Sequence, residues 1–415
     1  TYQLDRCRLD SHLLQSAEDL GCEVWRPASV KELNLAGLGN NTLIVNHDGV
    51  QQQVCSKWVV DATGKAAFLA RKLGHLRKVD SHKTSAIWAR FKNVTDLDNP
   101  DLKERFPDFA DAVRCPRSQA TNHLMGHGWW SWIIPLKNGE VSAGLTYDSE
   151  LFTPPEGSTL TKRLHAHLLS HPIGKEMFSG AVPVEKDTRS YSGLAYYSTR
   201  PAGEGWICVG DAAGFIDPLY SQGLDYCAHS VSFATKIIAK SHEGKCIKAD
   251  IIDYAEQFVT SYLRWYHALY RGKYRYLGDA ELMNAAFWLD IGTYFIGPVR
   301  LVHDDPCKEF PRFPYYGTPG KIFANFMRFY NQRLGKIGER RYAAGKYGQA
   351  NLDKRYLIHE GFAPCKKAAF KVILKGVFKW LWIEVRSLFL PRLSKKASGL
   401  SSPQQPVEQE LTTNH

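Results

Sequence analysis

The alternation of apolar and polar residues predicts three kinds of region along the chain. Period-two alternation, with turn signals such as Asn46-His47-Asp48-Gly49, predicts strands before residue 80 and again over residues 84–147. Beyond residue 245, apolar residues recur at helical spacing. The predicted helices are 10–20, 65–73, 159–169, 224–238, 254–270, 280–295 and 322–342, with one short helix in the surface segment 96–117; the predicted strands include 22–25, 43–45, 58–60, 189–197 and 206–209.

Two of the predicted strands end in a glycine turn that leads into a helix. Strand 58–60 runs into Asp61-Ala62-Thr63-Gly64, and strand 206–209 runs into Gly210-Asp211 and then Ser221-Gln222-Gly223. Glycine lets the backbone approach a ligand closely, and the first N–H groups of a helix favour an anion or an electron-rich group. An ionised Asp accepts hydrogen bonds, which suits a sugar hydroxyl. The two junctions therefore form the candidate binding site.

The strand-rich segment between the junctions indicates an inserted domain. We predict a mixed α/β protein with a first domain at 1–80 and 187–245, an inserted β-sheet domain at 81–186, a helical region at 246–395 and a disordered tail at 396–415. Aromatic residues of the helical region line either a core or a substrate pocket, and their spacing does not choose between the two. These residues are Trp265, Tyr266, Tyr270, Tyr274, Tyr276, Phe287, Trp288, Tyr294 and Phe295.

Composition narrows the class of protein. An apolar content of 44% and a charged content of 23% are typical of globular proteins, and the net charge of +11 is compatible with a phosphate-bearing cofactor or an anionic surface. Nine scattered cysteines without a C-x-x-C pair predict neither a disulfide framework nor a metal site, so a cytoplasmic location is the default. Nucleic-acid modules are not visible in the sequence, and no nucleic-acid partner is predicted.

The segment 368–390 has lysines on an otherwise apolar helix. Lys371, Lys375 and Lys379 interrupt a face that contains Phe370, Phe378 and other large apolar residues. These charges argue against a membrane-spanning helix. Two interpretations remain open: the helix lies on an anionic membrane as a peripheral contact, or it packs on its own domain with the lysine stems exposed.

Three segments together resemble the superfamily of FAD-dependent monooxygenases and halogenases, which has the para-hydroxybenzoate-hydroxylase-like fold. They are the helix that begins near Arg6, the segment that ends in Asp61-Ala62-Thr63-Gly64, and the segment from Gly210-Asp211 to Gly223. In that superfamily the aspartate that corresponds to Asp211 contacts the ribityl chain of the flavin. The resemblance implies an FAD site at Arg6, Asp61, Gly64, Gly210, Asp211, Pro218 and Gly223.

A fourth segment resembles the flavin-dependent halogenases in particular. Trp130, Trp132, Ile134 and Pro135 fit the W-x-W-x-I-P signature of that family, and the amides of Ser221, Gln222 and Gly223 correspond to its halide site. The resemblance implies FADH2 from a separate flavin reductase, a C4a-hydroperoxide, and chloride or bromide converted to hypohalous acid that reacts with a small electron-rich aromatic substrate. Tyr220 and Gln222 stand where tryptophan halogenases carry other residues, which argues against tryptophan as the substrate.

The superfamily's G-x-G-x-x-G fingerprint is not found, and the chain begins at Thr1 within a charged segment. We therefore expect that an N-terminal segment is missing, together with the active-site lysine of the family, and we assign no catalytic residue. Two enzymatic alternatives stay open: an aromatic hydroxylase on the same fold, and a flavoprotein similar to geranylgeranyl reductases. A non-catalytic binding protein on a membrane is the alternative from another class.

Overall fold

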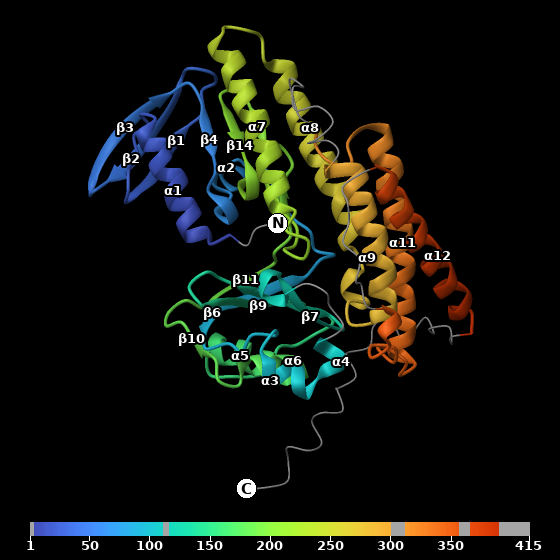
Figure 1. Cartoon of the computed structure of the whole chain (residues 1–415). Coiled ribbons are helices and arrows are strands. Elements are labelled where there is room, and N and C mark those ends of the chain that lie inside the picture. Colours follow the sequence, from blue (N-terminus) through green and yellow to red (C-terminus); the bar gives the residue numbers. More distant parts are fainter. Residues whose placement is uncertain (1–3, 111–115, 300–311, 357–365, 390–415) are drawn as a thin grey trace.

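The computed structural model describes residues 4–110, 116–299, 312–356 and 366–389. An α/β unit lies beside a group of long helices, and an inserted sheet lies below both in the view of Figure 1. The mixed α/β class predicted from the sequence is confirmed. The predicted tail 396–415, and the end of the predicted helical region beyond residue 389, lie outside the described residues.

The α/β unit is formed by segments from both sides of the inserted sheet. Its parallel pair joins β4 (Val59–Asp61) to β14 (Trp206–Cys208), with Val60 opposite Ile207. Antiparallel strands β1 (Ala28–Asn34), β2 (Asn41–His47) and β3 (Val50–Ser56) form a separate sheet, and β5 (Leu76–Lys78), β12 (Tyr196–Ser198) and β15 (Gly214–Phe215) form another. The remaining elements are α1 (Arg6–Asp19), α2 (Phe68–Lys72), β13 (Ala202–Gly203) and α7 (Gly223–His242).

Three local predictions for this unit were wrong. Helix α1 begins at Arg6, because Asp10 lies inside the helix and pairs with Arg6 one turn away (2.9 Å) instead of capping the helix. Residues 22–25 form no strand; the first strand begins at Ala28, directly after a proline, which has no N–H for a ladder. The helix predicted at 65–73 is divided at Ala67, which has a left-handed φ of 44°, into a 3-10 turn and α2.

The inserted sheet runs in the order β10-β6-β9-β8-β7, with β11 also paired to β6. Its hairpin of β8 (Trp129–Pro135) and β9 (Val141–Asp148) confirms the predicted Asn-Gly hairpin. The other strands are β6 (Thr84–Lys92), β7 (Asn122–Gly126), β10 (Val182–Pro183) and β11 (Arg189–Ser192). Helices α5 (Leu160–Ser170) and α6 (Pro172–Phe178) cover one face of the sheet (Figure 1).

Two boundaries of this domain differ from the prediction. The stretch 189–197 is two strands in different sheets, because Gly193, with a φ of 59°, turns the chain between β11 and β12. The chain therefore returns to the α/β unit at Gly193 instead of residue 187. The surface segment 96–117 contains two short helices, α3 (Pro100–Arg105) and α4 (Pro107–Ala110), where one was predicted, because Pro107 cannot continue the first helix.

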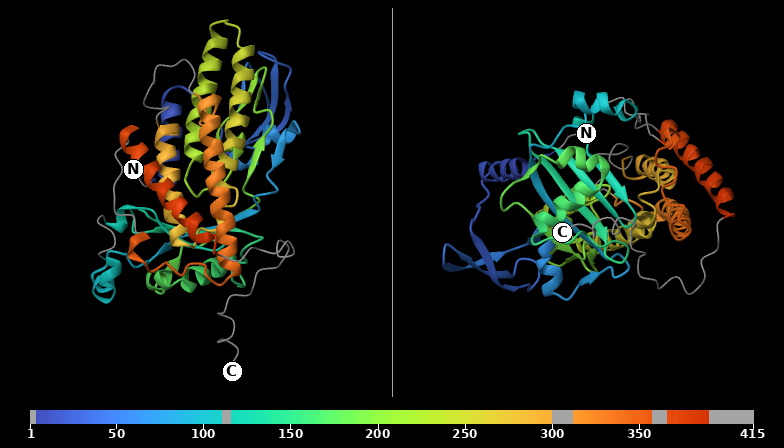
Figure 2. Two further views of the ribbon diagram at one scale, coloured as in Figure 1. Left: turned by 90° about the vertical axis from the view of Figure 1, so that its right-hand side faces the viewer. Right: turned by 90° about the horizontal axis from the view of Figure 1, so that it is seen from below.

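The long helices lie side by side (Figure 2). They are α8 (Lys248–Trp265) with a π-helical turn at Tyr266–Tyr270, α9 (Ala280–Tyr294), α11 (Gly317–Ala343) and α12 (Lys366–Ser387). The three helices predicted between residues 254 and 342 are confirmed. Within the described residues, no helix is long and apolar enough to cross a membrane.

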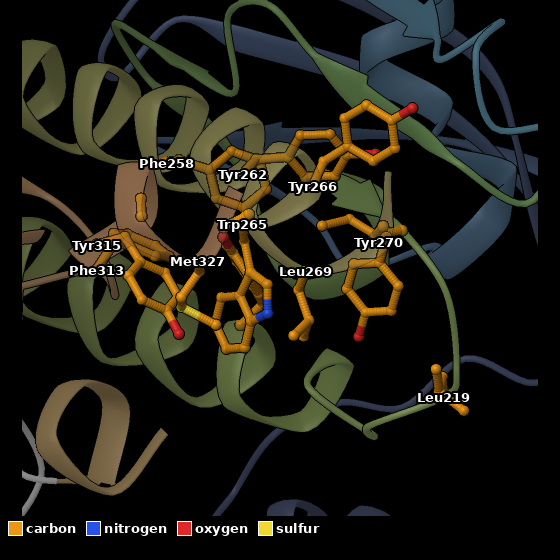
Figure 3. Close-up of a cluster of buried hydrophobic side chains, with 14 of the residues drawn as sticks. Leu219, Phe258, Tyr262, Trp265, Tyr266, Leu269, Tyr270, Phe313, Tyr315 and Met327 are labelled. Carbon is orange, nitrogen blue, oxygen red and sulfur yellow. The ribbon is translucent and has the colours of Figure 1, made fainter. Parts of the chain in front are cut away.

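Most of the aromatic residues singled out in the helical region belong to the core. Trp265, Tyr266, Tyr270, Tyr274 and Tyr276 are all at most 2% exposed. Figure 3 shows part of this cluster, which extends from Phe313 and Tyr315 to Leu219 in the loop before α7. The core of the helical region is therefore continuous with the loop of the candidate site.

Candidate functional site

The parallel pairing of β4 and β14 brings the two glycine junctions to one edge of the sheet. Cys208 lies opposite Asp61, and the N–H of Val209 donates to the Asp61 carbonyl oxygen (2.9 Å). The next residues along β14, Gly210 and Asp211, therefore lie beside the turn that follows Asp61. Parallel strands place their carboxyl ends together, which is where α/β sheets bind ligands.

The Asp61 carboxylate is fully used within the chain. One oxygen accepts from the N–H (2.9 Å) and the hydroxyl (2.7 Å) of Thr63, and the other accepts from the N–H of Leu69 (2.7 Å). These bonds hold the turn and the first residues of α2, and Asp61 is only 3% exposed. Gly64 stands in this turn with a φ of 60°, a conformation that favours glycine. The Asp61 carboxylate thus stabilises the turn that follows β4 at this edge of the sheet.

The Asp211 carboxylate is in the opposite situation. It is half-buried, and among the described residues it accepts no hydrogen bond. Burial raises the pKa of Asp211, and the nearby Arg6 guanidinium partly offsets this shift. Arg6, predicted as a cofactor residue, therefore faces Asp211 across the site while it pairs with Asp10 on its own helix. A half-buried acid without a partner is suited to accept hydrogen bonds from a ligand.

Glycines keep the space beside Asp211 open. A Cβ added to Gly223 would lie 3.8 Å from a carboxylate oxygen of Asp211 and 3.7 Å from the Phe215 ring. Gly210 has a φ of 55° and donates its N–H to the Ser230 hydroxyl (2.8 Å), which fixes the strand end against α7. The backbone at Gly223, without a side chain, therefore lies next to the Asp211 carboxylate.

The loop before α7 ends in two N–H groups that have no acceptor within the described residues. The N–H of Ser221 donates to the Pro218 carbonyl (3.1 Å), and Ser221 has a left-handed φ of 56°. The N–H groups of Gln222 and Gly223 follow and begin α7, whose dipole adds partial positive charge there. Of the three amides predicted to hold an anion, the Ser221 amide already donates within the turn. Those of Gln222 and Gly223 have no acceptor among the described residues and could donate to an anion.

The W-x-W-x-I-P segment lies in β8, and the side chains of this strand point to both faces of the sheet. Trp130 and Trp132 lie on one face, with Trp130 in the large core of the α/β unit and the helices. Trp129 and Ile133 point the other way, into a second core beneath α5 and α6. The Trp132 indole donates to Ser142 (3.3 Å), while Ile134 and Pro135 end the strand, both half-buried.

Sequence reasoning missed the residues that connect Trp130 to the loop. The Trp130 indole N–H donates to the Tyr274 hydroxyl (2.9 Å), which in turn donates to the Asp217 carboxylate (2.7 Å). His82 lies 3.0 Å from the same carboxylate oxygen. Only the aromatic run around Tyr274 carried a signal, and nothing in the sequence singled out His82.

A second buried polar cluster holds Tyr220. The Tyr220 hydroxyl donates to Asp290 (2.9 Å), which also pairs with the Lys273 ammonium (2.5 Å) and accepts from the Tyr330 hydroxyl (2.5 Å). Burial lowers the pKa of Lys273, and the Asp290 carboxylate opposes that shift. A fully buried lysine that keeps a carboxylate partner is a structural ion pair that fixes the loop from the side of α9.

Two cavities adjoin Tyr220. The larger, about 460 Å³, lies between β7 (His123, Met125), the loop (Leu219, Tyr220) and α9. The smaller, about 160 Å³, is lined mostly by aromatic and aliphatic residues and by Asp290; Tyr220 and Phe287 line both cavities. His123 is exposed on the larger cavity, and partial desolvation by the surrounding protein lowers the pKa of its imidazole, which is therefore neutral near pH 7.

Comparison with known proteins identifies the family. The family description of tryptophan halogenases matches residues 1–266, which is more than half of the chain. The chain belongs to the tryptophan halogenase family. Among curated members, the tetracycline 7-halogenase of Kitasatospora aureofaciens is 25% identical over 328 residues, which cover 74% of this chain and 57% of that protein. The chain thus spans little more than half the length of this relative.

Solved structures of halogenases have the same fold. The halogenase PltM in complex with phloroglucinol and FAD matches with a TM-score of 0.66 at 16% identity, over 91% of this chain and 75% of that one. The flavin-dependent brominase Bmp2 matches with a TM-score of 0.55 at 22% identity, over 80% of this chain and 77% of that one. At these identities the comparison establishes a mixed α/β fold that resembles flavin-dependent halogenases.

Proposed function

We propose that this chain is part of a flavin-dependent halogenase with a para-hydroxybenzoate-hydroxylase-like FAD domain. Membership of the tryptophan halogenase family supports the reaction class. The observation that carries the assignment to this edge is the unpartnered Asp211 carboxylate beside the unpaired amides of Gln222 and Gly223. The Asp211 carboxylate can accept hydrogen bonds from a chain that bears hydroxyl groups, and the two amides can donate to an anion or an electron-rich ring.

The residues at this edge fit FAD. Asp211 would accept hydrogen bonds from the ribityl hydroxyls, and Gly210, Pro218 and Gly223 would leave room for the ring system beside the start of α7. The space that a Cβ on Gly223 would fill supports this placement. Reduced FAD, supplied by a separate flavin reductase, would provide the oxygen chemistry that oxidises a halide. This chain's own contribution is to orient the flavin and to position its partners.

The amides of Gln222 and Gly223 would hold the halide. Backbone N–H groups at a helix start can bind an anion without a charged side chain. The buried Gln222 side chain keeps these amides in place, because it donates to the Asp217 carbonyl (2.8 Å) and accepts from the Tyr270 hydroxyl. Chloride and bromide are both candidates, and the structural relative Bmp2 is a brominase.

The larger cavity would hold the aromatic substrate. It adjoins Leu219 and Tyr220 in the halide loop, and about 460 Å³ is within the usual size range for small-molecule sites. The neutral His123 imidazole at its wall offers an acceptor for a phenol O–H or a pyrrole N–H, because the pKa of His123 is about 4. We therefore favour a small electron-rich aromatic substrate.

The test is product mass. The protein is supplied with FAD, a flavin reductase with NADH, dioxygen and bromide or chloride, and is offered phenols, pyrroles and indoles. Halogenated products that follow the halide supplied would support the proposal. Oxygenated products alone would instead make the protein an aromatic hydroxylase. Flavin fluorescence titration of the same sample separates a lack of FAD binding from a lack of chemistry.

A peripheral contact with an anionic membrane is a second proposal, and α12 supports it. Trp380 and Ile383 face the neighbouring helices and are buried, whereas Phe378 and Trp382 are 70% and 62% exposed. Figures 1 and 2 show α12 at the outer edge of the helical region. Lys371 is exposed on the same helix. An outward aromatic face next to lysines is typical of helices that lie on anionic lipid. The protein would then work in the cytoplasm.

Co-sedimentation with vesicles tests this contact. Vesicles that contain phosphatidylserine are expected to bind the protein more strongly than vesicles of phosphatidylcholine alone, and Phe378→Ser with Trp382→Ser should abolish the difference. Ile322→Ser, which removes an equally exposed apolar side chain from α11, is the matched control. Equal binding by all three proteins would contradict the proposal.

A further inference from the structure

We propose that Tyr274 and His82 are positioning residues that fasten the loop at residues 217–223 to Trp130, so that the tryptophan of β8 sets the geometry of the anion-binding amides. The inference rests on the proposed function only for the identity of the anion. Its structural part concerns a buried chain of hydrogen bonds that joins all three regions of the molecule.

The chain of hydrogen bonds has one allowed direction. An indole N–H only donates and an ionised carboxylate only accepts. The Tyr274 oxygen must therefore accept from Trp130 (2.9 Å), and its single proton must go to Asp217 (2.7 Å). The His82 Nε2 atom lies 3.0 Å from the same carboxylate oxygen and donates to it in the tautomer that carries the proton on Nε2.

Asp217 passes this constraint on to both ends of the loop. Its second carboxylate oxygen accepts from the N–H of Leu219 (3.0 Å), and its carbonyl accepts from the side chain of Gln222 (2.8 Å). Asp217 is fully buried, and His82 is 4% exposed. The position of the Asp217 carboxylate thus determines where the amides of Gln222 and Gly223 begin α7.

The three anchors come from two regions outside the loop, the inserted domain and the helical region. Trp130 lies on the inserted sheet, Tyr274 in a 3-10 turn of the helical region (Lys273–Arg275), and His82 just before β6. A loop held only by its own neighbours would keep its shape if these regions moved relative to one another. Here a displacement of the sheet or of the turn is transmitted to Asp217, because each bond is buried and short.

Loss of the Tyr274 hydroxyl would loosen the loop without leaving a large cavity. Tyr274→Phe leaves the Trp130 N–H without an acceptor and removes one of the donors to Asp217. Losing a hydrogen bond to a buried charge corresponds to about a tenfold or larger change in a local equilibrium. We expect the hydrogen-bonded amides of Leu219 and Ser221 to exchange with deuterium about tenfold faster in Tyr274→Phe.

Hydrogen–deuterium exchange tests the proposal without catalysis. The matched control is Tyr226→Phe, which also deletes a buried tyrosine hydroxyl, but one that bonds Ser261 (2.8 Å) and does not reach Asp217. Faster exchange of the Leu219 and Ser221 amides in Tyr274→Phe, with no such change in Tyr226→Phe, supports the positioning role. Equal exchange in both variants would overturn it.

A second variant keeps the test decisive if Tyr274→Phe does not fold. His82→Leu removes a donor to the same oxygen of Asp217 from the opposite side. It should accelerate exchange in the same peptide, and in a folded double variant the two effects should not add, because both act through Asp217. Unchanged exchange in His82→Leu would exclude His82 from the role.

Bromide separates this inference from the proposed function. Adding bromide to the unsubstituted protein should protect the amides of Gln222 and Gly223, and Tyr274→Phe should raise the bromide concentration for half-protection about tenfold. Absence of protection in the unsubstituted protein would count against the halide site, while the comparison of Tyr274→Phe with Tyr226→Phe would still decide the positioning role.

Discussion

Replacing Asp61 or Asp211 by asparagine should damage different properties of the protein, although both acids occupy corresponding junctions. Asp61 accepts three hydrogen bonds from its own chain, at 2.9, 2.7 and 2.7 Å. Asparagine can keep the acceptor that faces Thr63, but it then points an amide N–H₂ at the N–H of Leu69. Two donors face each other, and α2 loses its anchor.

The expected cost follows from these contacts. One charge-assisted bond is lost and one buried N–H is left without an acceptor, which corresponds to about 2 to 3 kcal/mol of unfolding free energy. Asp211 accepts no hydrogen bond from the described residues, and burial raises its pKa. Asp211→Asn should therefore change the unfolding free energy by less than about 0.5 kcal/mol, but weaken FAD binding about tenfold.

Denaturation by urea, followed by tryptophan fluorescence, measures the first property, and titration with FAD at a temperature where every variant is folded measures the second. The reasoning would be refuted by an Asp61→Asn protein as stable as the parent. It would equally be refuted if a folded Asp61→Asn protein lost FAD affinity as severely as Asp211→Asn, because Asp61 would then contact the cofactor.

Further predictions concern buried groups. Lys273→Met should destabilise the protein by about 3 to 5 kcal/mol, because Asp290 is left as a buried charge, and adding Asp290→Asn should recover part of the loss in urea denaturation. Burial lowers the pKa of His167 to about 3, below its unfolded value near 6.5, so the unfolded chain binds more protons between these values and stability falls as the pH falls. Between pH 7 and pH 5 this group should cost about 2 kcal/mol, and a pH series of urea midpoints should be flatter in His167→Gln. Gly144→Ala should shift tryptophan fluorescence, because the new methyl group would overlap the Trp132 ring.

The elements of this fold could be predicted where the sequence carried a local signal. The Asn-Gly turn at residues 138–139 and the apolar spacing of α8, α9 and α11 gave the hairpin and the long helices. Predictions failed where a tertiary contact decided: Asp61 reaching Leu69 divides the helix at 65–73, and Gly193 sends β12 to another sheet. Asp10 is a residue type that often caps a helix, and it was predicted to begin this one. The helix begins earlier, at Arg6, and Asp10 pairs with Arg6 inside it.

The candidate site shows the same limit. The resemblance assigned Asp211 and the amides of residues 221–223 to one site, but it did not distinguish the Ser221 amide, which is hydrogen-bonded within the turn, from those of Gln222 and Gly223. His82 and Tyr274 lie far apart in the sequence and meet only at Asp217. A contact between distant residues leaves no mark in spacing or composition, so only the folded chain reveals it.

The partition between the two cavities has a consequence for the evolution of substrate range. Tyr220 and Phe287 line both cavities, and the inner one, about 160 Å³, is close to the volume that holds a benzene ring in an engineered protein cavity. Tyr220 and Phe287 therefore stand between the two cavities. A smaller side chain at Phe287 would enlarge the larger cavity toward the smaller one, while the loop at residues 217–223 and its anchors stayed as they are.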